Sequence, residues 1–289
     1  MIGFVNVYKP EGESSSRTVQ FVKHVLIRKL GCDKKIKVGH FGTLDPDASG
    51  VLPIAVGNAC RLFDFSLDKR KIYVAQIHFG LLTDTLDTHG EVIEKIECEV
   101  SEQDFLDTLK AFPKEYDQIP PNVSAKSVGG VRAYKLARQG VEFSLPPKKV
   151  EIFSLKYLRK ISKSVFEFEV ECSSGTYIRS LCRDLGDKMG LPASMGALLR
   201  TKSGEFDLDF AVKKEEFEED PIKYLISEDI VLKKVEKYNL PCEDILKMKN
   251  GILVDTDALD GIYKIKENGE IVGLARACQG KMKFTTRLR

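Results

Sequence analysis

The chain has 289 residues, and its 45 Lys and Arg against 43 Asp and Glu give a formal net charge of +2 at pH 7. This near balance excludes a protein that attracts nucleic acid through its overall charge, so a nucleic-acid partner would have to meet a local basic surface. The length and the 43% hydrophobic content exclude a disordered chain and allow one large domain with a small one beside it.

The number and spacing of the cysteines bear on whether the fold is stabilised by zinc or by disulfides. There are seven, an odd number, dispersed and without a C-x-x-C pair: Cys32, Cys60, Cys98, Cys172, Cys182, Cys242 and Cys278. This spacing argues against a zinc site or a disulfide framework, and we expect reduced, buried and inert thiols. No run approaches the length of a membrane span, and the first residues lack the pattern of a signal peptide. We therefore predict a soluble, cytoplasmic protein.

The chain begins with a predicted strand over residues 2–8 and a turn at residues 9–12. Ser14, Ser15 or Ser16 can cap a helix that ends at Gly31. The apolar face of this helix would be Val19, Val22, Val25, Leu26 and Leu30. Between residues 9 and 37 eight basic residues outnumber three acidic ones: Lys9, Arg17, Lys23, Arg28, Lys29, Lys34, Lys35 and Lys37 against Glu11, Glu13 and Asp33.

The next stretch, residues 38–53, places one carboxylate among glycines. Gly39, Gly42 and Gly50 permit close approach of another molecule to the backbone. Pro46 pushes Asp45 towards extended geometry, so the carboxylate is presented by a stiff loop. The apolar run at residues 51–56 would anchor this loop in a core. Taken alone, the pattern is more typical of an ordinary surface turn.

Strands and one helix follow in the middle of the chain. Residues 71–80 and 92–96 read as strands joined by a polar turn at residues 83–90. A helix starts at residues 101–104, with Phe105, Leu106, Leu109 and Phe112 as its apolar face. After the break at Pro120 and Pro121, residues 131–139 suit a short helix closed by Gly140.

Two more strands are predicted at residues 149–158 and 164–172. In the second, Phe166, Phe168, Val170 and Cys172 alternate with three glutamates, which predicts a sheet with one face in water. A turn at residues 173–176 leads into a helix that ends at Gly190, with Ile178, Leu181, Leu185 and Met189 on its apolar face. A last strand lies near residues 198–206.

The charged segment at residues 213–229 indicates a boundary with a helix inside it. Beyond it, Asn250-Gly251, Asp260-Gly261 and Asn268-Gly269 are turn signals between short apolar strands. We therefore predict a small β-rich module over residues 230–289.

Several ordered motifs between about residues 2 and 210 resemble those of the TruB family of tRNA pseudouridine synthases. Residues 39–46 match the family pattern Gly-His-x-Gly-(Thr/Ala)-Leu-Asp-Pro, and residues 9–14 match its Lys-Pro-x-Gly-x-Ser string. Residues 71–73 resemble its Lys-x-Tyr motif, and residues 172–179 its Cys-Ser-x-Gly-Thr-Tyr-Ile-Arg motif. Residues 9–14 also have a plain interpretation, a strand-to-helix connection that braces the loop.

The resemblance implies three catalytic residues. Asp45 would be the essential acid, whether it attacks the sugar, attacks the base or removes a proton. Tyr73 would stack on the target uracil. Arg179 would pair with Asp45, orient it and keep it ionised, and Asp87 would hold Arg179 from the other side. Without the family, Tyr73 would be a core tyrosine and Arg179 a solvated helix residue.

The resemblance also implies residues that bind the substrate. His40 would contact the RNA and fill the space left by the flipped nucleotide. The remaining substrate-binding candidates in the matching motifs are Gly42, Thr43, Lys71, Tyr177 and Leu198. Asp45 and Asp47 form an Asp-x-Asp pair, but Pro46 between them and the lack of a third nearby ligand argue against a divalent ion.

Residues 119–148 resemble a family insertion that closes on the RNA. We expect Lys126 and Arg132 to contact phosphates there, against the alternative of a solvated helix. This segment departs from the family pattern, which has an aromatic residue where Val123 stands and a lysine where Ser127 stands.

The implied fold is α+β, the pseudouridine-synthase fold, with a largely antiparallel mixed sheet, flanking helices and a small C-terminal β-rich PUA-like domain. The catalytic domain would span residues 1–229 and the PUA-like RNA-binding domain residues 230–289. The implied activity is conversion of uridine 55 in the T arm of tRNA to pseudouridine, without cofactor or metal. The partner would be the tRNA T stem-loop, with no obligate protein partner and a monomeric chain.

Two alternatives stay open. The catalytic subunit of guide-RNA pseudouridylation complexes carries the same motifs, and activity on bare tRNA would separate the two. A protein that binds or refolds RNA without chemistry is disfavoured by the intact Asp45, Tyr73 and Arg179.

Overall fold

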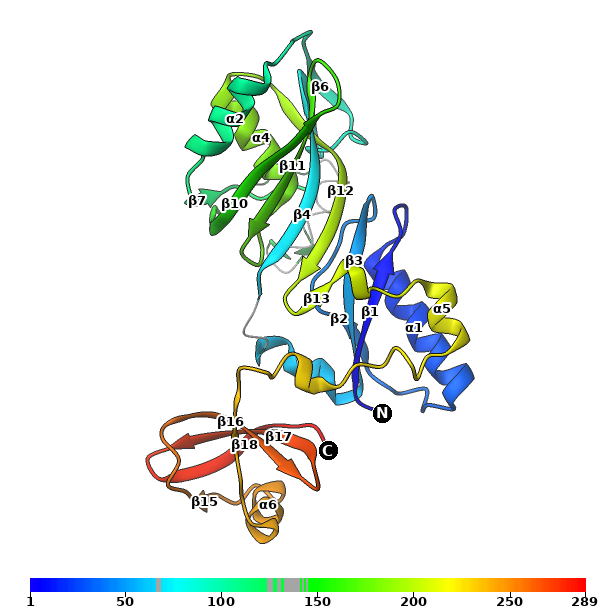
Figure 1. Cartoon of the computed structure of the whole chain (residues 1–289), viewed down its shortest axis with the longest axis vertical. Helices are drawn as coiled ribbons and strands as arrows, with labels where there is room; N and C mark the ends of the chain where they lie inside the picture. Colours follow the sequence, from blue (N-terminus) through cyan, green and yellow to red (C-terminus); the bar gives the residue numbers. More distant parts are fainter. Residues whose placement is uncertain (66–68, 124–126, 129–130, 133–140, 142, 144) are drawn as a thin grey trace. The chain divides into compact units, whose positions relative to one another are not determined.

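The computed structural model describes residues 1–65, 69–123, 127–128, 131–132, 141, 143 and 145–289 (Figure 1). Two compact units make up the chain. Unit 1 consists of residues 1–69 and 203–289, and unit 2 of residues 70–202.

Unit 1 begins with a small antiparallel sheet that carries the Asp45 loop. Strand β1 (Gly3–Lys9) pairs with β3 (Ala48–Val56), from Gly3 opposite Val56 to Lys9 opposite Gly50. Strand β2 (Val38–His40) pairs with β3 as well, and a 3-10 helix, η1 (Gly57–Phe65), follows β3. The buried run after Asp45 is confirmed, because all of β3 except Ser49 is buried.

Helix α1 (Ser15–Leu30) lies between β1 and β2 in the chain and confirms the prediction from its caps. The Ser14 side chain accepts a hydrogen bond from the Arg17 N–H, and Gly31 ends the helix at φ +63°. A left-handed residue at this position favours glycine.

The chain returns to unit 1 at Ser203 and runs along β1. It forms β13 (Phe206–Asp207), η2 (Leu208–Phe210), α5 (Lys214–Glu219) and η3 (Glu228–Ile230). The Tyr8 N–H donates to the Val212 carbonyl at 2.9 Å, and the Phe4 N–H to the Ile226 carbonyl at 2.8 Å. A helix inside the charged segment was predicted and is present as α5.

The C-terminal part of unit 1 is a five-stranded sheet in the order β14-β16-β17-β18-β15, which confirms the β-rich module (Figure 1). The strands are β14 (Glu236–Tyr238), β15 (Val254–Asp255), β16 (Gly261–Glu267), β17 (Glu270–Cys278) and β18 (Lys281–Arg287). Asn268 and Gly269 both have positive φ in the turn between β16 and β17. Asn250-Gly251, by contrast, follows a helix that was not predicted, α6 (Cys242–Lys249), so this signal marks a helix end.

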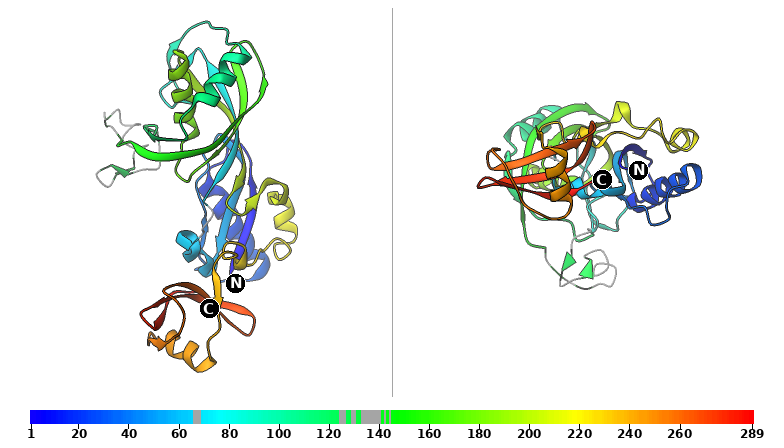
Figure 2. Two further views of the ribbon diagram at one scale, coloured as in Figure 1. Left: turned by 60° about the vertical axis from the view of Figure 1, so that its left-hand side comes forward. Right: turned by 90° about the horizontal axis from the view of Figure 1, so that it is seen from below.

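Unit 2 is an antiparallel sheet with two helices on one face. The strand order is β12-β4-β11-β10-β7. The strands are β4 (Lys71–Phe79), β7 (Glu115–Gln118), β10 (Lys148–Lys160), β11 (Val165–Cys172) and β12 (Ala193–Ser203). Figures 1 and 2 show the two helices, α2 (Glu102–Ala111) and α4 (Ile178–Met189), beside each other on this sheet. A short hairpin, β5 (Leu81–Thr83) with β6 (Val92–Lys95), follows β4.

The alternation in β11 is confirmed and defines the core of unit 2. Phe166, Phe168 and Val170 have no exposed surface, while the glutamates between them are partly exposed. Phe105 of α2 packs against both Phe166 and Phe79. Helix α2 therefore covers the apolar face of this sheet, as its sequence periodicity predicts.

Several sequence predictions need correction. Strand β7 was not predicted, because its residues Glu115, Tyr116, Asp117 and Gln118 are mostly polar. Strand β12 begins at Ala193, well before residue 198. Val131–Arg132 is a strand, β9, paired with β8 (Ser127–Val128), and not the start of a helix; residues 133–140 lie outside the described residues.

All seven cysteines are free, but the expectation that they are buried is wrong, since Cys242 and Cys278 are exposed. Among the described residues, no helix combines the length and the apolar character that a membrane span requires.

Candidate active site

The Asp45 loop in unit 1 is fixed by hydrogen bonds from α1. Ser15 donates its hydroxyl to the Leu44 carbonyl at 2.7 Å and accepts from the Leu44 N–H at 2.9 Å. Leu44 is buried, whereas Asp45 is half-buried. The loop also closes on itself, because the Ala48 N–H donates to the Asp45 carbonyl at 3.1 Å. A half-exposed carboxylate on a fixed loop can meet a ligand without a large rearrangement.

Residues 9–14 brace the same loop from the other side, which confirms the plain interpretation of this string. The Lys9 side chain has no exposed surface, and its ammonium donates to the carbonyls of Pro10 at 2.9 Å, Glu13 at 2.5 Å and Pro46 at 3.0 Å. The Gly12 N–H also donates to the Pro46 carbonyl at 2.9 Å. Hydrogen bonds to a buried charge are worth more than neutral ones, so Lys9 strongly favours this loop conformation.

The loop glycines differ in conformation. Gly42 and Gly50 have φ values of +115° and +109°, which L side chains rarely adopt. Gly39 lies in β2 without a positive φ. Beside Gly42, Thr43 is exposed and His40 is half-buried at the end of β2. The backbone around Asp45 therefore depends on two of the three glycines.

In unit 2, Tyr73 and Lys71 lie on the same face of β4. Tyr73 is only 6% exposed. Lys71 is paired in register with Cys172 of β11, and burial together with the nearby Arg200 charge lowers the pKa of the Lys71 amine to about 8. Leu198 of β12 is 7% exposed and Arg200 is fully buried. Since successive strand residues alternate faces, Lys71 and Tyr73 point to the helix-covered side.

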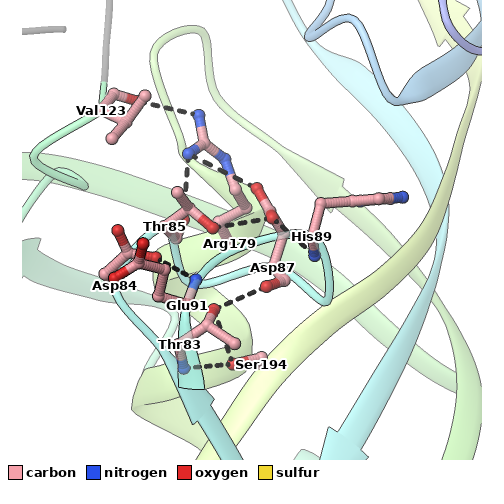
Figure 3. A network of polar contacts seen from close by, with 9 residues as sticks. All are labelled: Thr83, Asp84, Thr85, Asp87, His89, Glu91, Val123, Arg179 and Ser194. Carbon is pink, nitrogen blue, oxygen red and sulfur yellow. Dashed lines mark hydrogen bonds and ion pairs between the residues drawn. The ribbon is translucent and has the colours of Figure 1, made fainter. Parts of the chain in front are cut away.

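Arg179 is held at the start of α4 by three groups (Figure 3). Its guanidinium donates to the Thr85 carbonyl at 3.0 Å and to the Val123 carbonyl at 3.1 Å, and it lies 3.8 Å from the Asp87 carboxylate. The side chain is buried, and Asp87 is largely so. The structure thus brings the predicted pair Arg179 and Asp87 together, while the role of the pair stays a prediction.

The turn that presents Asp87 is itself ordered by side chains. One Asp87 carboxylate oxygen accepts from the Thr85 hydroxyl at 2.8 Å and from the His89 N–H at 3.1 Å (Figure 3). The Thr83 hydroxyl donates to the Asp87 carbonyl at 2.5 Å, and Leu86 adopts a positive φ of 62°. Contacts within its own turn therefore hold Asp87 in place, independently of Arg179.

Gln118 is a residue that sequence reasoning missed. It is buried, and its amide donates to the Tyr177 carbonyl at 3.1 Å and accepts from the Tyr177 N–H at 2.8 Å. It also donates to the Tyr116 hydroxyl at 2.7 Å, and Tyr116 donates to Asp184 at 2.9 Å. Burial and the Asp184 charge raise the pKa of Tyr116 far above its ordinary value, so this hydroxyl stays protonated.

The remaining candidates are less well defined. Lys126 lies outside the described residues, and Arg132 is described only through its backbone in β9. Asp45, His40, Gly42 and Thr43 belong to unit 1, whereas the other described candidates belong to unit 2. The pairing of Asp45 with Arg179 therefore stays a prediction. In the described part of the chain, no three His, Cys, Asp or Glu side chains form a potential metal site.

Comparisons with known proteins agree on one family. The model of the TruB family pseudouridylate synthase N-terminal domain matches residues 28–178, and that of the tRNA pseudouridylate synthase B C-terminal domain matches residues 179–247. A tRNA pseudouridine synthase B of Clostridium tetani is 36% identical over 284 residues, covering 96% of both chains. That of Thermosipho melanesiensis is 39% identical over 292 residues, covering 96% of this chain and 91% of the relative.

Among solved structures, the fold is similar to a chain of an H/ACA ribonucleoprotein bound to a substrate RNA containing 2'-deoxyuridine, with a TM-score of 0.70. Sequence identity is 22%, and the alignment covers 99% of this chain and 85% of that one. This likeness shows the α+β fold alone. The family models and the relatives of similar length show that the chain belongs to the TruB family of pseudouridylate synthases, which are isomerases.

Proposed function

We propose that this TruB-family enzyme converts uridine 55 in the T arm of tRNA to pseudouridine, with the Asp45 carboxylate at the centre of the reaction. The observation that carries the proposal is the loop of residues 39–46, which keeps the whole family motif and is braced by Lys9 and Ser15. Relatives named tRNA pseudouridine synthase B that match almost their whole length support the tRNA substrate.

The reaction is an isomerisation that needs no external oxidant. The bond between N1 of uracil and C1' of the ribose breaks, the base rotates, and a bond forms between C5 and C1'. The C5 proton leaves to solvent and N1 gains a proton, so atoms and electrons balance. One carboxylate can serve as nucleophile or as base in such a sequence, and Asp45 is the candidate.

Arg179 and Tyr73 would assist from unit 2. The contacts of Arg179 with Thr85, Val123 and Asp87 leave its guanidinium little freedom, which supports a role in orienting Asp45. The nearly buried Tyr73 ring would stack on the uracil once the nucleotide has left the RNA stack. Tyr177, Leu198 and Lys71 would line the same base pocket.

RNA recognition would use the groups around these residues. His40, Gly42 and Thr43 would contact the target loop, and Lys126 and Arg132 its phosphates. We propose residues 1–229 as the catalytic domain and residues 230–289 as a PUA-like RNA-binding domain. We further propose a cytoplasmic monomer that needs no cofactor, metal or obligate protein partner.

An unmodified full-length tRNA transcript tests the substrate and the position together. Incubation with the purified chain alone, followed by carbodiimide labelling and primer extension, should give one new stop, immediately 3' of uridine 55. A stop elsewhere would reject the assigned position. Modification only in the presence of a guide RNA and partner proteins would favour the guide-dependent alternative.

A further inference from the structure

A chain of largely buried hydrogen bonds in unit 2 runs from Asp184 on α4 to the backbone of Tyr177. The Tyr116 hydroxyl donates to Oδ2 of Asp184 at 2.9 Å, and the amide nitrogen of Gln118 donates to the Tyr116 hydroxyl at 2.7 Å. Gln118 in turn contacts the backbone of Tyr177. The reaction described above gives no role to Asp184 or Tyr116. Their contacts bear on one thing, the orientation of the Gln118 amide.

The Asp184 end of this chain is held as an acceptor. Its Oδ1 accepts from Nε and Nη2 of Arg183 at 2.9 and 2.6 Å, and Nη2 also donates to the Ile119 carbonyl at 3.3 Å. Burial raises the pKa of Asp184, while the Arg183 guanidinium acts in the opposite direction and favours the charged form. A carboxylate has no hydrogen to donate. The hydroxyl hydrogen of Tyr116 therefore points to Asp184, which leaves the Tyr116 oxygen as an acceptor.

The Gln118 amide could be placed in two ways, because its oxygen and nitrogen have nearly the same size. In the observed orientation the oxygen accepts from the Tyr177 N–H at 2.8 Å, and the nitrogen donates to the Tyr177 carbonyl at 3.1 Å. A reversed amide would bring two donors together at the first contact and two acceptors at the second. Gln118 is only 1% exposed, so water could not replace the lost partners. The Tyr116 oxygen accepts from the same nitrogen and so selects the observed orientation.

We propose that Asp184 is a positioning residue for the active site, which acts through Tyr116 and Gln118 on the backbone of Tyr177. Asp184 sets the direction of the hydroxyl, the hydroxyl sets the direction of the amide, and the amide holds the Tyr177 N–H and carbonyl. Asp184 lies about two turns along α4 from Tyr177, whereas Tyr116 and Gln118 belong to β7. The chain therefore ties the start of the helix to a strand at the edge of the sheet.

Tyr177 is the point at which this chain meets the proposed reaction. It is the N-cap residue of α4, and its carbonyl accepts from the Leu181 N–H at 3.0 Å. The inference rests on the proposed function, in which Tyr177 lines the base pocket and Arg179 orients Asp45. A reversed amide would shift the start of the helix and with it both side chains. Binding of a whole tRNA would depend mostly on contacts elsewhere, so the effect falls on kcat rather than on KM.

Asp184→Asn tests the direction of the chain. The new amide would turn its oxygen to the Arg183 charge and its nitrogen to Tyr116, so the hydroxyl would lose its acceptor and turn to Gln118. We expect kcat on a tRNA transcript to fall roughly tenfold, with KM within about twofold of wild type. Tyr116→Phe removes the hydroxyl and should lower kcat only about threefold, because Gln118 keeps both contacts with Tyr177.

The double variant Asp184→Asn/Tyr116→Phe separates positioning from a general loss of stability. Without the hydroxyl nothing reverses the Gln118 amide, so kcat should recover to the level of Tyr116→Phe. Losses that come from stability alone would add instead. Asp187→Asn removes the same charge from an exposed site of the same helix and should behave like wild type. Urea unfolding checks that each variant is folded.

Hydrogen exchange of the Tyr177 amide gives a readout that does not require turnover. Its protection should fall in Asp184→Asn and recover in the double variant. A double variant no faster than Asp184→Asn overturns the proposal, and so does a wild-type kcat in Asp184→Asn. If Asp184→Asn does not fold, Tyr116→Phe decides, and an unchanged kcat there overturns the proposal. A wild type without pseudouridine formation would reject the proposed function, and the order of Tyr177 protection would then decide on Asp184.

Discussion

At the scale of single residues, the start of α4 is held by two buried polar groups that act in different ways. Asp87 contacts the Arg179 guanidinium through charge, and Gln118 pairs with the backbone of Tyr177 through both ends of its amide. The motif at residues 172–179 identifies Tyr177 and Arg179 from sequence alone. Gln118 could not be found that way, because it lies in a short polar strand and pairs with a residue 59 positions later.

Replacement of Gln118 by leucine tests this support. Leucine has a similar size but cannot hydrogen-bond, so the Tyr177 N–H and carbonyl lose their partner, and we expect the free energy of unfolding to fall by about 2–4 kcal/mol. We also expect a lower kcat, since Tyr177 and Arg179 share this helix start. Urea unfolding and turnover of a tRNA transcript measure the two effects. Gln103→Leu on the exposed face of α2 is the control and should change stability by less than about 0.5 kcal/mol. An unchanged Gln118→Leu variant would reject the supporting role.

At the scale of elements, helix α1 connects the Asp45 loop to helix α5, through Ser15 at its start and Arg28 near its end. Its caps and apolar face could be read directly from Ser14, Gly31 and the spacing of its valines. Two contacts could not be predicted from the sequence: that of Ser15 in the first turn with Leu44, and that of Glu13 with Lys214. They join residues that are 29 and 201 positions apart in the chain. Local patterns therefore predict the helix, and only the tertiary structure reveals what it braces.

The Glu13 pair gives a pH-dependent prediction. Burial acts to raise the pKa of Glu13, but hydrogen bonds from Lys214 and Thr18 and the Lys214 and Arg17 charges outweigh it, so the pKa is lowered. A lowered pKa in the folded state stabilises the fold above the unfolded-state pKa, and this contribution is lost as pH falls through the folded-state pKa. Glu13→Gln should therefore cost about 1 kcal/mol at pH 7 and progressively less below about pH 4.

Urea unfolding at pH 7 and pH 3 measures this difference. Glu11→Gln is the matched control, because Glu11 lies in the same turn and is exposed. We expect the control to behave like wild type at both pH values. An equal loss for Glu13→Gln at pH 7 and pH 3 would mean that its charge is not the cause.

At the scale of the whole molecule, unit 1 combines the two ends of the chain in one core. Phe4, Val51 and Leu62 share a buried cluster with Leu274 and Leu288 of the C-terminal segment. The side chain of Asn58 also donates to the Leu288 carbonyl at 2.9 Å. The turn signals and apolar strands of the C-terminal module were predicted from sequence, but no local pattern shows which distant surface an apolar residue near the chain end will contact.

Leu288→Ala tests this shared core. The side chain is fully buried, so its truncation should lower the free energy of unfolding by about 2–4 kcal/mol through lost contacts and the cavity left behind. Chemical denaturation followed by circular dichroism measures the change. Leu259→Ala removes the same atoms from an 82% exposed site and should be nearly neutral. Equal effects of the two variants would contradict the shared core.

The most direct test of Asp45 as the reacting group is tritium release from a T-arm stem-loop labelled at C5 of uridine, with Asp45→Asn beside the wild type. Isomerisation replaces the C5–H bond by a bond to the ribose, so each turnover releases one tritium to water. We expect release by the wild type without added metal or cofactor, and none by the variant, which should still fold and bind the RNA. Tritium release by Asp45→Asn would contradict the assignment. A wild type that binds the RNA tightly but releases no tritium would contradict it as well.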